Sequence, residues 1–307
     1  MENKQLLNTK FAGFLMTYER ADILEKTIEK ILSQSIAPEK LLIVDNSESN
    51  ATELMIKRLG NPILMYHKVG NNSGPAGAAK IGLEVLSKEG FDWIYWGDDD
   101  DAPIFDDTFK ILVSMALSNE KCGCVGVVGQ YFNRFTGFVK RVPNELLQSE
   151  GILKVDTIAG GMSKIVSGEM IRTQQIFPDE KLFFGMEELD FDLKIKKAGY
   201  SLLVDRPFYY KHRQKWNRIE FPNKSLQAKS ENALVREYYS IRNGLYIYKK
   251  NGLVGACIIF FLYYATKQIF SFKFGISQGK NRLKNFLKAI SDLFSSKMGR
   301  YITSNKK

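Results

Sequence analysis

The sequence predicts an α/β protein in which a mainly parallel sheet, flanked by helices, is followed by a helical C-terminal region. Three observations lead to this prediction. Short apolar runs alternate with segments of helical periodicity along the first third of the 307 residues, as in βαβ units. Several of these runs end abruptly in polar or acidic residues. The net charge is −6 for residues 1–210 and +16 for residues 211–307, so the chain has two chemically different parts.

The N-terminal elements are expected in a regular order. They are a strand at 11–16, a helix at 23–32, a strand at 41–44, a helix at 51–59, a strand at 63–66, a glycine-led helix at 74–86 and a strand at 91–97. Strands joined through helices form right-handed parallel crossovers. We therefore expect an α/β domain at residues 1–215 and a basic helical region at residues 216–307.

Beyond residue 120 the expected elements are less regular. They are a strand at 124–130, a hairpin-like excursion at 132–142, a helix ending near Gly199 and a returning strand at 200–204. Three cysteines, an odd number without a paired metal spacing, suit a reducing compartment. The N-terminus lacks the apolar segment of a secretory signal, so the N-terminal part is expected to be cytoplasmic.

The most informative segment is the aspartate run Asp98–Asp101, which directly follows the apolar strand expected at 91–97. Four adjacent carboxylates repel one another, and burial raises the cost of their charge. A divalent cation removes that cost, and oxygen ligands of this kind suit Mg²⁺ or Mn²⁺. On an extended backbone Asp98 and Asp100 would point toward one ion, while Asp99 and Asp101 would point away. The alternative is a solvated acidic turn.

Other polar residues fall at the same edge of the predicted sheet. Thr17, Asp45 and Asn72 each follow an apolar strand, as the aspartate run does. Ligands of parallel α/β sheets bind at the carboxyl ends of the strands. The order of the elements alone therefore predicts a ligand site at this edge.

Two further positions carry chemistry. His212 follows the strand expected at 200–204, and a neutral imidazole is a suitable third ligand beside carboxylates; the alternative is a surface histidine. Glu187 and Glu188 follow a glycine turn and open a helix. A carboxylate there can act as a general base toward an attacking hydroxyl, or it can simply interact with the helix dipole.

The C-terminal region contains two apolar or amphipathic segments. Residues 251–266 carry no charge, but sixteen helical residues reach only roughly 24 Å, which is shorter than the roughly 30 Å hydrocarbon core. Residues 280–297 have six apolar side chains on one helical face with four Lys or Arg nearby. Both segments are typical of helices that lie in a membrane interface. Alternatively, the two helices pack onto the N-terminal domain or form a homo-oligomer.

With these motifs in place, the chain resembles the family 2 glycosyltransferases of GT-A fold, especially their galactofuranosyl- and rhamnosyltransferase-like branch. The resemblance covers roughly residues 11–215. It rests on Thr17-Tyr18-Glu19-Arg20, Val44-Asp45-Asn46-Ser47, Asn71-Asn72-Ser73-Gly74-Pro75-Ala76-Gly77, the Asp-x-Asp-like stretch from Trp93 to Pro103, and Phe183 to Leu193. The segment from Arg236 to Asn243 also resembles one found after the catalytic domain of this branch.

The resemblance implies a role for individual residues. It places Glu188 as the catalytic base, with Glu187 and Asp190 as the fallback positions. It places Asp98, Asp100 and His212 on the metal, with Asp99 in a shared metal and nucleotide role. The residues implied for nucleotide-sugar binding are Thr17, Tyr18, Arg20, Asp45, Asn46, Asn72, Gly74, Gly77 and Asp99.

The implied activity is a direct, inverting transfer that depends on Mn²⁺ or Mg²⁺. The donor would be a nucleotide sugar such as UDP-galactofuranose or dTDP-rhamnose, and the acceptor a cell-surface polysaccharide or lipid-linked glycan. The enzyme would be cytoplasmic and bound to the inner face of the cell membrane, with residues 216–307 facing the anionic lipid surface.

Two other classes of protein stay open from the sequence alone. A metal-dependent nucleotidyltransferase would use the same sheet but would have no need for Glu188. A nucleic-acid-binding protein would use the basic tail. No nucleic-acid partner is expected, because the aromatic residues at 258–270 form an apolar block and are not interleaved as stacking positions.

Overall fold

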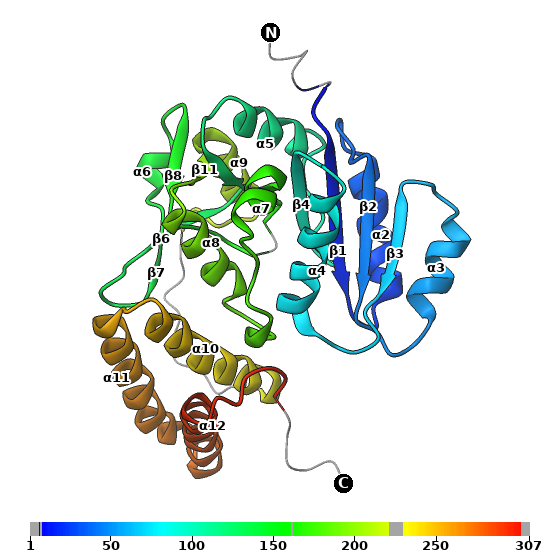
Figure 1. The fold of residues 1–307 in the computed structure, drawn as a ribbon. Helices are drawn as coiled ribbons and strands as arrows, with labels where there is room; N and C mark the ends of the chain where they lie inside the picture. Colours follow the sequence, from blue (N-terminus) through cyan, green and yellow to red (C-terminus); the bar gives the residue numbers. More distant parts are fainter. Residues whose placement is uncertain (1–5, 7, 161, 221–229, 302–307) are drawn as a thin grey trace.

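Four parallel strands form one half of a central sheet in the computed structural model, which describes residues 6, 8–160, 162–220 and 230–301 (Figure 1). These strands are β1 (Phe11–Thr17), β2 (Lys40–Asp45), β3 (Leu64–Lys68) and β4 (Trp93–Asp98). They lie in the order β3-β2-β1-β4, and every neighbouring pair is parallel. All four predicted N-terminal strands are confirmed within one or two residues at most of their ends.

The other half of the sheet is mixed. The remaining strands are β5 (Cys122–Val125), β8 (Ile152–Val155), β10 (Lys164–Ser167) and β11 (Ser201–Asp205). The antiparallel β10 lies between β4 and β5, β11 is parallel to β5, and β8 forms the antiparallel edge. The full order is β3-β2-β1-β4-β10-β5-β11-β8. The prediction of a mainly parallel α/β sheet is confirmed, but the sequence did not indicate β8 or β10.

The segment predicted as one strand at 124–130 is divided. β5 ends at Val125, and β6 (Gly129–Phe132) belongs to a separate three-stranded sheet with β7 (Val139–Arg141) and β9 (Thr157–Ile158). The predicted single strand is therefore wrong, whereas the hairpin-like excursion at 132–142 is confirmed by the antiparallel pairing of β6 with β7.

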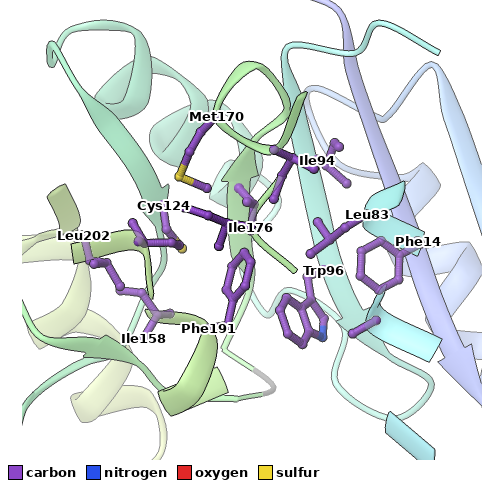
Figure 2. Packing of buried hydrophobic residues seen from close by; sticks show 14 of the residues in the cluster. Phe14, Leu83, Ile94, Trp96, Cys124, Ile158, Met170, Ile176, Phe191 and Leu202 are labelled. Carbon is purple, nitrogen blue, oxygen red and sulfur yellow. The ribbon is translucent and has the colours of Figure 1, made fainter. Parts of the chain in front are cut away.

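Helices cover both faces of the central sheet (Figure 1). Successive strand residues such as Phe14 and Leu15 belong to different apolar clusters, as the alternation of side chains along a strand requires. On one face Phe14 and Trp96 pack with residues of α4 (Gly74–Lys88), α7 (Gly168–Gln174) and α8 (Glu187–Lys197), as Figure 2 shows. On the other face Leu15 and Tyr95 pack with α2 (Ala21–Leu32) and α5 (Thr108–Leu117). Burial on both faces explains the nearly continuous apolar runs of these strands.

The shorter helices complete the α/β part. They are α3 (Ala51–Leu59), α6 (Asn144–Leu147), the 3₁₀ turn η1 (Glu180–Leu182) and α9 (Arg206–Lys215). Helix α8 is fixed against the end of β4 by an edge-to-face contact between Phe191 and Trp96, whose ring centroids are 5.5 Å apart. This contact brings the start of α8 close to the aspartate run.

Three helices form the C-terminal region to one side of the sheet (Figure 1). They are α10 (Glu231–Lys250), α11 (Val254–Phe270) with the 3₁₀ turn η2 (Ser271–Phe274), and α12 (Ile276–Phe294). They share an apolar cluster with η1 and α8 through residues such as Leu182 and Leu189. Parts of the region predicted at 216–307, namely 221–229 and 302–307, lie outside the described residues.

The apolar segment predicted at 251–266 is longer than expected. The stretch Val254–Phe274 has 21 residues, of which 22% in its most apolar window are buried. Within the part of the chain that the structure describes, it is one helical stretch long and apolar enough to cross a membrane, by length and composition only. The helical stretch thus extends beyond the uncharged segment, and Lys267 lies within it, with its ammonium 3.6 Å from Glu237 and over the ring of Tyr264.

Candidate functional site

The residues expected at the carboxyl edge of the sheet lie side by side. In the register of the strands, Thr17 of β1 is opposite Asp45 of β2, and Met16 is opposite Asp98 of β4. Three strand ends thus meet at one level, as the parallel order requires. The edge predicted from the order of the elements is confirmed.

The aspartate run turns at this edge. β4 ends at Asp98, and Asp99 and Asp100 lie in a turn. The guanidinium of Arg20 donates to Asp99 and, at 2.7 Å, to Asp100. Thr17 donates its hydroxyl to Asp99 at 2.8 Å. The expected alternation, with Asp99 pointing away from Asp100, is wrong because the backbone is no longer extended after Asp98.

The other two aspartates of the run have perturbed acidities. Burial, and then the charge of Glu188, raises the pKa of Asp98 to about 7. Burial, and then the charge of Asp100, raises the pKa of Asp101 to about 7. The Oδ2 atom of Asp101 is buried and has no hydrogen-bond partner. Carboxyl groups held this close together favour a bound cation, which stabilises their charged forms.

These residues fit a divalent cation that binds together with a phosphorylated ligand. Within the described residues, no three His, Cys, Asp or Glu side chains are close enough to form a metal site by themselves. Mg²⁺ and similar ions, however, are usually held by one or two carboxylates together with substrate phosphates. Asp98 and Asp100 can supply those carboxylates at the edge of the site.

His212 lies on α9 and is buried. Burial, and then the charge of Arg218, lowers the pKa of His212 to about 4, so its imidazole is neutral at pH 7, as a metal ligand must be. Its side chain lines a small pocket together with Asp101 and Phe208. The structure thus brings His212 to Asp101, the last member of the run, whereas we expected it beside Asp98 and Asp100.

The expected nucleotide-binding residues form a second group at the ends of β2 and β3. The carboxylate of Asp45 accepts hydrogen bonds from Tyr66 at 2.9 Å and from the backbone of Ser47 at 2.8 Å. Asn46 accepts from the backbone and hydroxyl of Ser73 at 3.0 and 2.8 Å. These bonds join two strand ends into one polar surface.

The glycine-rich start of α4 continues this surface. Asn72 accepts a hydrogen bond from the backbone of Gly74 at 3.0 Å, and Gly77 packs directly on Ser73, where a Cβ atom would lie 2.6 Å from the serine Cβ. Tyr18 is 38% exposed beside this edge, so its ring is accessible to a ligand.

Gly74 has a backbone conformation and a close contact that exclude other residues. Its φ is +69°, and a Cβ atom there would lie 2.2 Å from the carbonyl oxygen of Phe183. Gly74→Ala should therefore lower the unfolding free energy by more than the roughly 1–2 kcal/mol of left-handed backbone strain alone. Gly70→Ala is the matched control, because its φ is +85° with nothing within 4 Å of the added Cβ. Equal losses in urea titrations of the two variants would show that the Phe183 contact is unimportant.

Glu187 and Glu188 face the aspartate run from the start of α8. Burial raises the pKa of both groups above the ordinary value, and the ammonium of Lys164 opposes this increase. Gly160 leaves room for the carboxylate of Glu188, since a Cβ atom there would lie 2.1 Å from Oε1. Glu188 thus has raised basicity close to Asp98, a property that suits the predicted role as a general base.

The loop that leads into α8 has a strained backbone and is fixed by hydrogen bonds from α10. Phe183 and Met186 have φ values of +62° and +70°, which are unfavourable for residues with a side chain. The side-chain amide of Asn243 on α10 donates to the carbonyls of Leu182, Phe184 and Gly185 at 3.0, 3.0 and 2.9 Å. The C-terminal helices therefore fix the turn that presents Glu187 and Glu188.

Asp190 does not belong to the cluster of acidic side chains formed by the aspartate run, Glu187 and Glu188. It pairs with Lys194 at 2.5 Å and lies 3.8 Å from Lys250 of α10. Asp190 was one of the two fallback positions for the catalytic base, and its ion pairs favour a structural role between α8 and α10 instead.

Sequence reasoning missed a buried ion pair behind Glu188. Lys164 is 2% exposed and pairs with the fully buried Asp192 at 2.5 Å. Asp192 also accepts hydrogen bonds from the hydroxyl of Thr157 and the backbone of Ile158, both at 2.8 Å. The Lys164 ammonium lies 5.1 Å from the centre of the Trp96 ring. No sequence signal pointed to Lys164, because β10 itself was not predicted.

Removal of one partner from this pair should destabilise the fold strongly. Lys164→Met leaves the Asp192 carboxylate buried without its counter-charge, which costs about 3–5 kcal/mol. Urea titration measures this loss. Lys57→Met, which removes an exposed pair with Glu53, should leave the unfolding midpoint unchanged. A similar midpoint for both variants would contradict the structural role of Lys164.

Comparison with solved structures identifies the fold as GT-A. The mannosyltransferase PcManGT of Pyrobaculum calidifontis, solved with GDP-Man and Mn²⁺, has a TM-score of 0.56 at 12% identity and covers 94% of this chain and 88% of its own. GalNAc-T7, solved with UDP, GalNAc and Mn²⁺, has a TM-score of 0.57 at 14% identity over 94% of this chain and 57% of its own. S. aureus TarS in complex with UDP-GlcNAc has a TM-score of 0.53 at 14% identity, over 92% and 82%. The predicted GT-A fold is confirmed.

Sequence comparison then gives the family. Residues 14–166 match the model of glycosyl transferase family 2. The chain is 23% identical over 197 residues to galactofuranosyltransferase GlfT1 of Mycolicibacterium smegmatis, covering 60% of this chain and 65% of that protein. The values for GlfT1 of Mycobacterium tuberculosis are 23%, 198 residues, 60% and 64%. The chain belongs to glycosyl transferase family 2, and it spans just under two thirds of the length of these relatives.

Proposed function

We propose that the protein is a metal-dependent, inverting glycosyltransferase that moves a sugar from a nucleotide donor to a hydroxyl group of a glycan. One observation carries the proposal: the carboxylates at the end of β4 and at the start of α8 lie close enough together that, in addition to burial, the charge of Glu188 raises the pKa of Asp98. The donor diphosphate would bind on the β4 side and the acceptor hydroxyl on the α8 side. Family membership supports this division of roles.

Side chains of the protein would bind the nucleotide and accept the proton in this reaction. The nucleotide would lie along Thr17, Asp45 and Asn46, at the ends of β1 and β2. Glu188 would accept the proton of the acceptor hydroxyl while the oxygen attacks the anomeric carbon from the face opposite the diphosphate. The new glycosidic bond forms as the bond to the diphosphate breaks, and no covalent enzyme intermediate is needed.

The metal would be held at the aspartate run by Asp98 and Asp100 together with the donor phosphates, with Asp99 and His212 as the further ligands proposed there. A bound Mn²⁺ or Mg²⁺ would stabilise the negative charge of the departing diphosphate. Arg20, which pairs with Asp99 and Asp100, would contribute positive charge at the same place. Two of the solved structures with this fold contain Mn²⁺, which supports the choice of ion.

The donor we favour is UDP-galactofuranose, with dTDP-rhamnose as the second candidate. The relatives identified by sequence are named galactofuranosyltransferases, and S. aureus TarS shares the fold and binds UDP-GlcNAc. The acceptor would be a growing cell-surface polysaccharide or a lipid-linked glycan.

Residues 216–307 would place the enzyme at the anionic inner face of the cell membrane. The exposed apolar side chains of α11 and α12 support this part of the proposal, among them Val254, Ile269, Phe270, Ile276 and Phe294. The net charge of +16 in residues 211–307 favours an anionic lipid surface. The division of the chain at residues 215 and 216 belongs to the same proposal.

A panel of nucleotide sugars tests the donor assignment. We expect calorimetry to show binding of UDP-galactofuranose in the presence of Mn²⁺ and weaker binding after the metal is removed with a chelator. Slow hydrolysis should release UDP; release of inorganic pyrophosphate would instead indicate a nucleotidyltransferase. No binding of any nucleotide sugar with Mn²⁺ or Mg²⁺ would refute the proposed function.

A further inference from the structure

Two adjacent hollows lie among the C-terminal helices, away from the carboxyl groups described above. The first is an apolar groove of about 600 Å³ between α10, α11 and α12, within the roughly 300–1,000 Å³ of typical small-molecule sites. The second is a polar hollow of about 640 Å³ beside η1. Lys249 and Leu293 line both hollows, so the two lie directly beside each other.

The groove offers a surface for a hydrocarbon chain. Its lining is mostly apolar and includes Leu253, Ile258, Phe261, Ile290 and Phe294. The polar side chains in the lining are Lys249, Cys257 and Tyr248, whose hydroxyl already donates to the carbonyl of Gly137. Several of these side chains are exposed: Ile258 by 55% and Phe294 by 78%. Apolar side chains gathered in an open concave surface are typical of a binding site.

The polar hollow offers positive charge at one end of the groove. Lys181, Lys249 and Lys250 line it. Lys250 pairs with Asp179 at 2.8 Å, and Glu180, the acidic residue of the lining, pairs with Lys80 at 3.0 Å. In the described part of the chain, the side chains of Lys181 and Lys249 have no ion-pair or hydrogen-bond partner. Two ammonium groups are therefore available to an anion.

We propose that these two adjacent hollows together bind one lipid that carries a phosphate or diphosphate head group, with its hydrocarbon chain in the groove and its head group at Lys181 and Lys249. The match of an apolar groove to a cationic end carries the proposal, because a neutral apolar ligand would leave the two lysines unused. An acidic or polar peptide would likewise leave the groove unfilled.

The site has a direct connection to the proposed active site. Lys181 belongs to η1, which leads into the loop before Glu187, and Asn243 on α10 holds that loop. In combination with the proposed function, on which this step rests, the lipid would be the anchor of the acceptor glycan. Its head group would then be held at the segment that presents Glu188.

Thiol reactivity gives a direct measure of occupancy. Cys257 lines the groove and is partly exposed, whereas Cys122 and Cys124 are buried, so a maleimide should modify Cys257 first. We expect geranylgeranyl diphosphate, added to the full-length protein without donor or metal, to slow this modification. Geranylgeraniol should act more weakly, and inorganic pyrophosphate should have no effect. The Cys257→Ser variant provides the background rate.

Two matched pairs of variants locate the two parts of the lipid. Ile258→Asp puts a charge into the groove and should weaken protection at least about tenfold, whereas Ile269→Asp, at a 70% exposed position of the same helix outside the groove, should leave it unchanged. Lys181→Gln/Lys249→Gln should weaken protection by the diphosphate about tenfold. Lys26→Gln/Lys110→Gln, which removes the same charge from exposed positions of α2 and α5, should not.

The proposal fails if the diphosphate does not slow modification of Cys257, or if pyrophosphate alone protects it equally. Equal loss in Ile258→Asp and Ile269→Asp would indicate general adsorption to an apolar surface and would also overturn it. Protection that rises with protein concentration without any lipid would instead assign the groove to a second copy of the chain. Calorimetry of donor binding on the same samples is independent of these results, so failure of the lipid site and failure of the glycosyltransferase assignment can be distinguished.

Discussion

Replacement of Glu188 by Gln is expected to abolish transfer while donor binding persists. The amide has the shape of the carboxylate but cannot accept the proton of the acceptor hydroxyl, and loss of a general base costs roughly 10²–10⁴ in rate. The residues that we propose to contact the donor, at the ends of β1 and β2, are untouched by this change. Initial rates with acceptor, and calorimetry with UDP-galactofuranose and Mn²⁺, measure the two effects separately.

Asp190→Asn is the matched control on the same helix. Asp190 pairs with Lys194 and lies outside the cluster formed by the aspartate run, Glu187 and Glu188. Replacement by Asn should therefore lower the stability of the fold and leave most of the turnover intact. Glu187→Gln separates the two neighbouring candidates for the base. If Glu188→Gln retains turnover while Glu187→Gln loses it, the base is Glu187; if donor binding is lost in Glu188→Gln with the fold intact, the proposed role is wrong.

Asp100→Ala is expected to remove metal-dependent donor binding and transfer without loss of stability. The side chain is 51% exposed and bonds to Arg20, whose side chain is 43% exposed, so we expect the fold not to depend on it. Loss of one group that stabilises the departing diphosphate should reduce the rate by roughly 10²–10³. Donor affinity with and without Mn²⁺, together with a thermal unfolding curve, tests both statements.

Asp106→Ala provides the control for this variant. Asp106 is also exposed but lies beyond the aspartate run, and its replacement should change neither the metal dependence nor the rate. An unchanged Mn²⁺ effect in Asp100→Ala would contradict the assignment of this residue. If the same effect were then lost in Asp101→Ala, the metal-binding register would lie one residue later and closer to His212.

The parallel half of the fold could be predicted because the apolar composition of its strands directly reflects their burial on both faces of the sheet. Strands buried on both faces, such as Leu41 to Val44, are continuously apolar, and the residue that follows them marks the carboxyl edge. Thr17, Asp45 and Asp98 were placed at one level by this reasoning, and the strand register agrees. Local sequence and tertiary position coincide here.

The mixed half could not be predicted, since its strands depend on distant partners. β10 has four residues, and its pairing with β4 rather than its own composition makes it a strand. Its Lys164 reads in the sequence as an ordinary surface lysine, and only the fold shows that it is buried against Asp192. An ion pair between residues so far apart in the chain has no local signature.

The acidic residues near the end of β4 could be identified from the sequence, but the arrangement of their side chains could not. The run from Asp98 was identified, yet the turn after β4 brings Asp99 and Asp100 to the same guanidinium, that of Arg20. The contribution of the C-terminal helices was missed for a similar reason. Asn243 lies in a segment noted for its resemblance to the family, but its three bonds to the loop before α8 depend on the packing of α10.

The most direct test of the central claim is a crystal structure of the protein with Mn²⁺ and UDP-galactofuranose, with the metal located by its anomalous scattering. We predict one manganese ion in contact with Asp98 or Asp100 and with the donor diphosphate, and the sugar between this ion and Glu188. A nucleotide bound elsewhere, with no metal at the end of β4, would contradict the proposed mechanism.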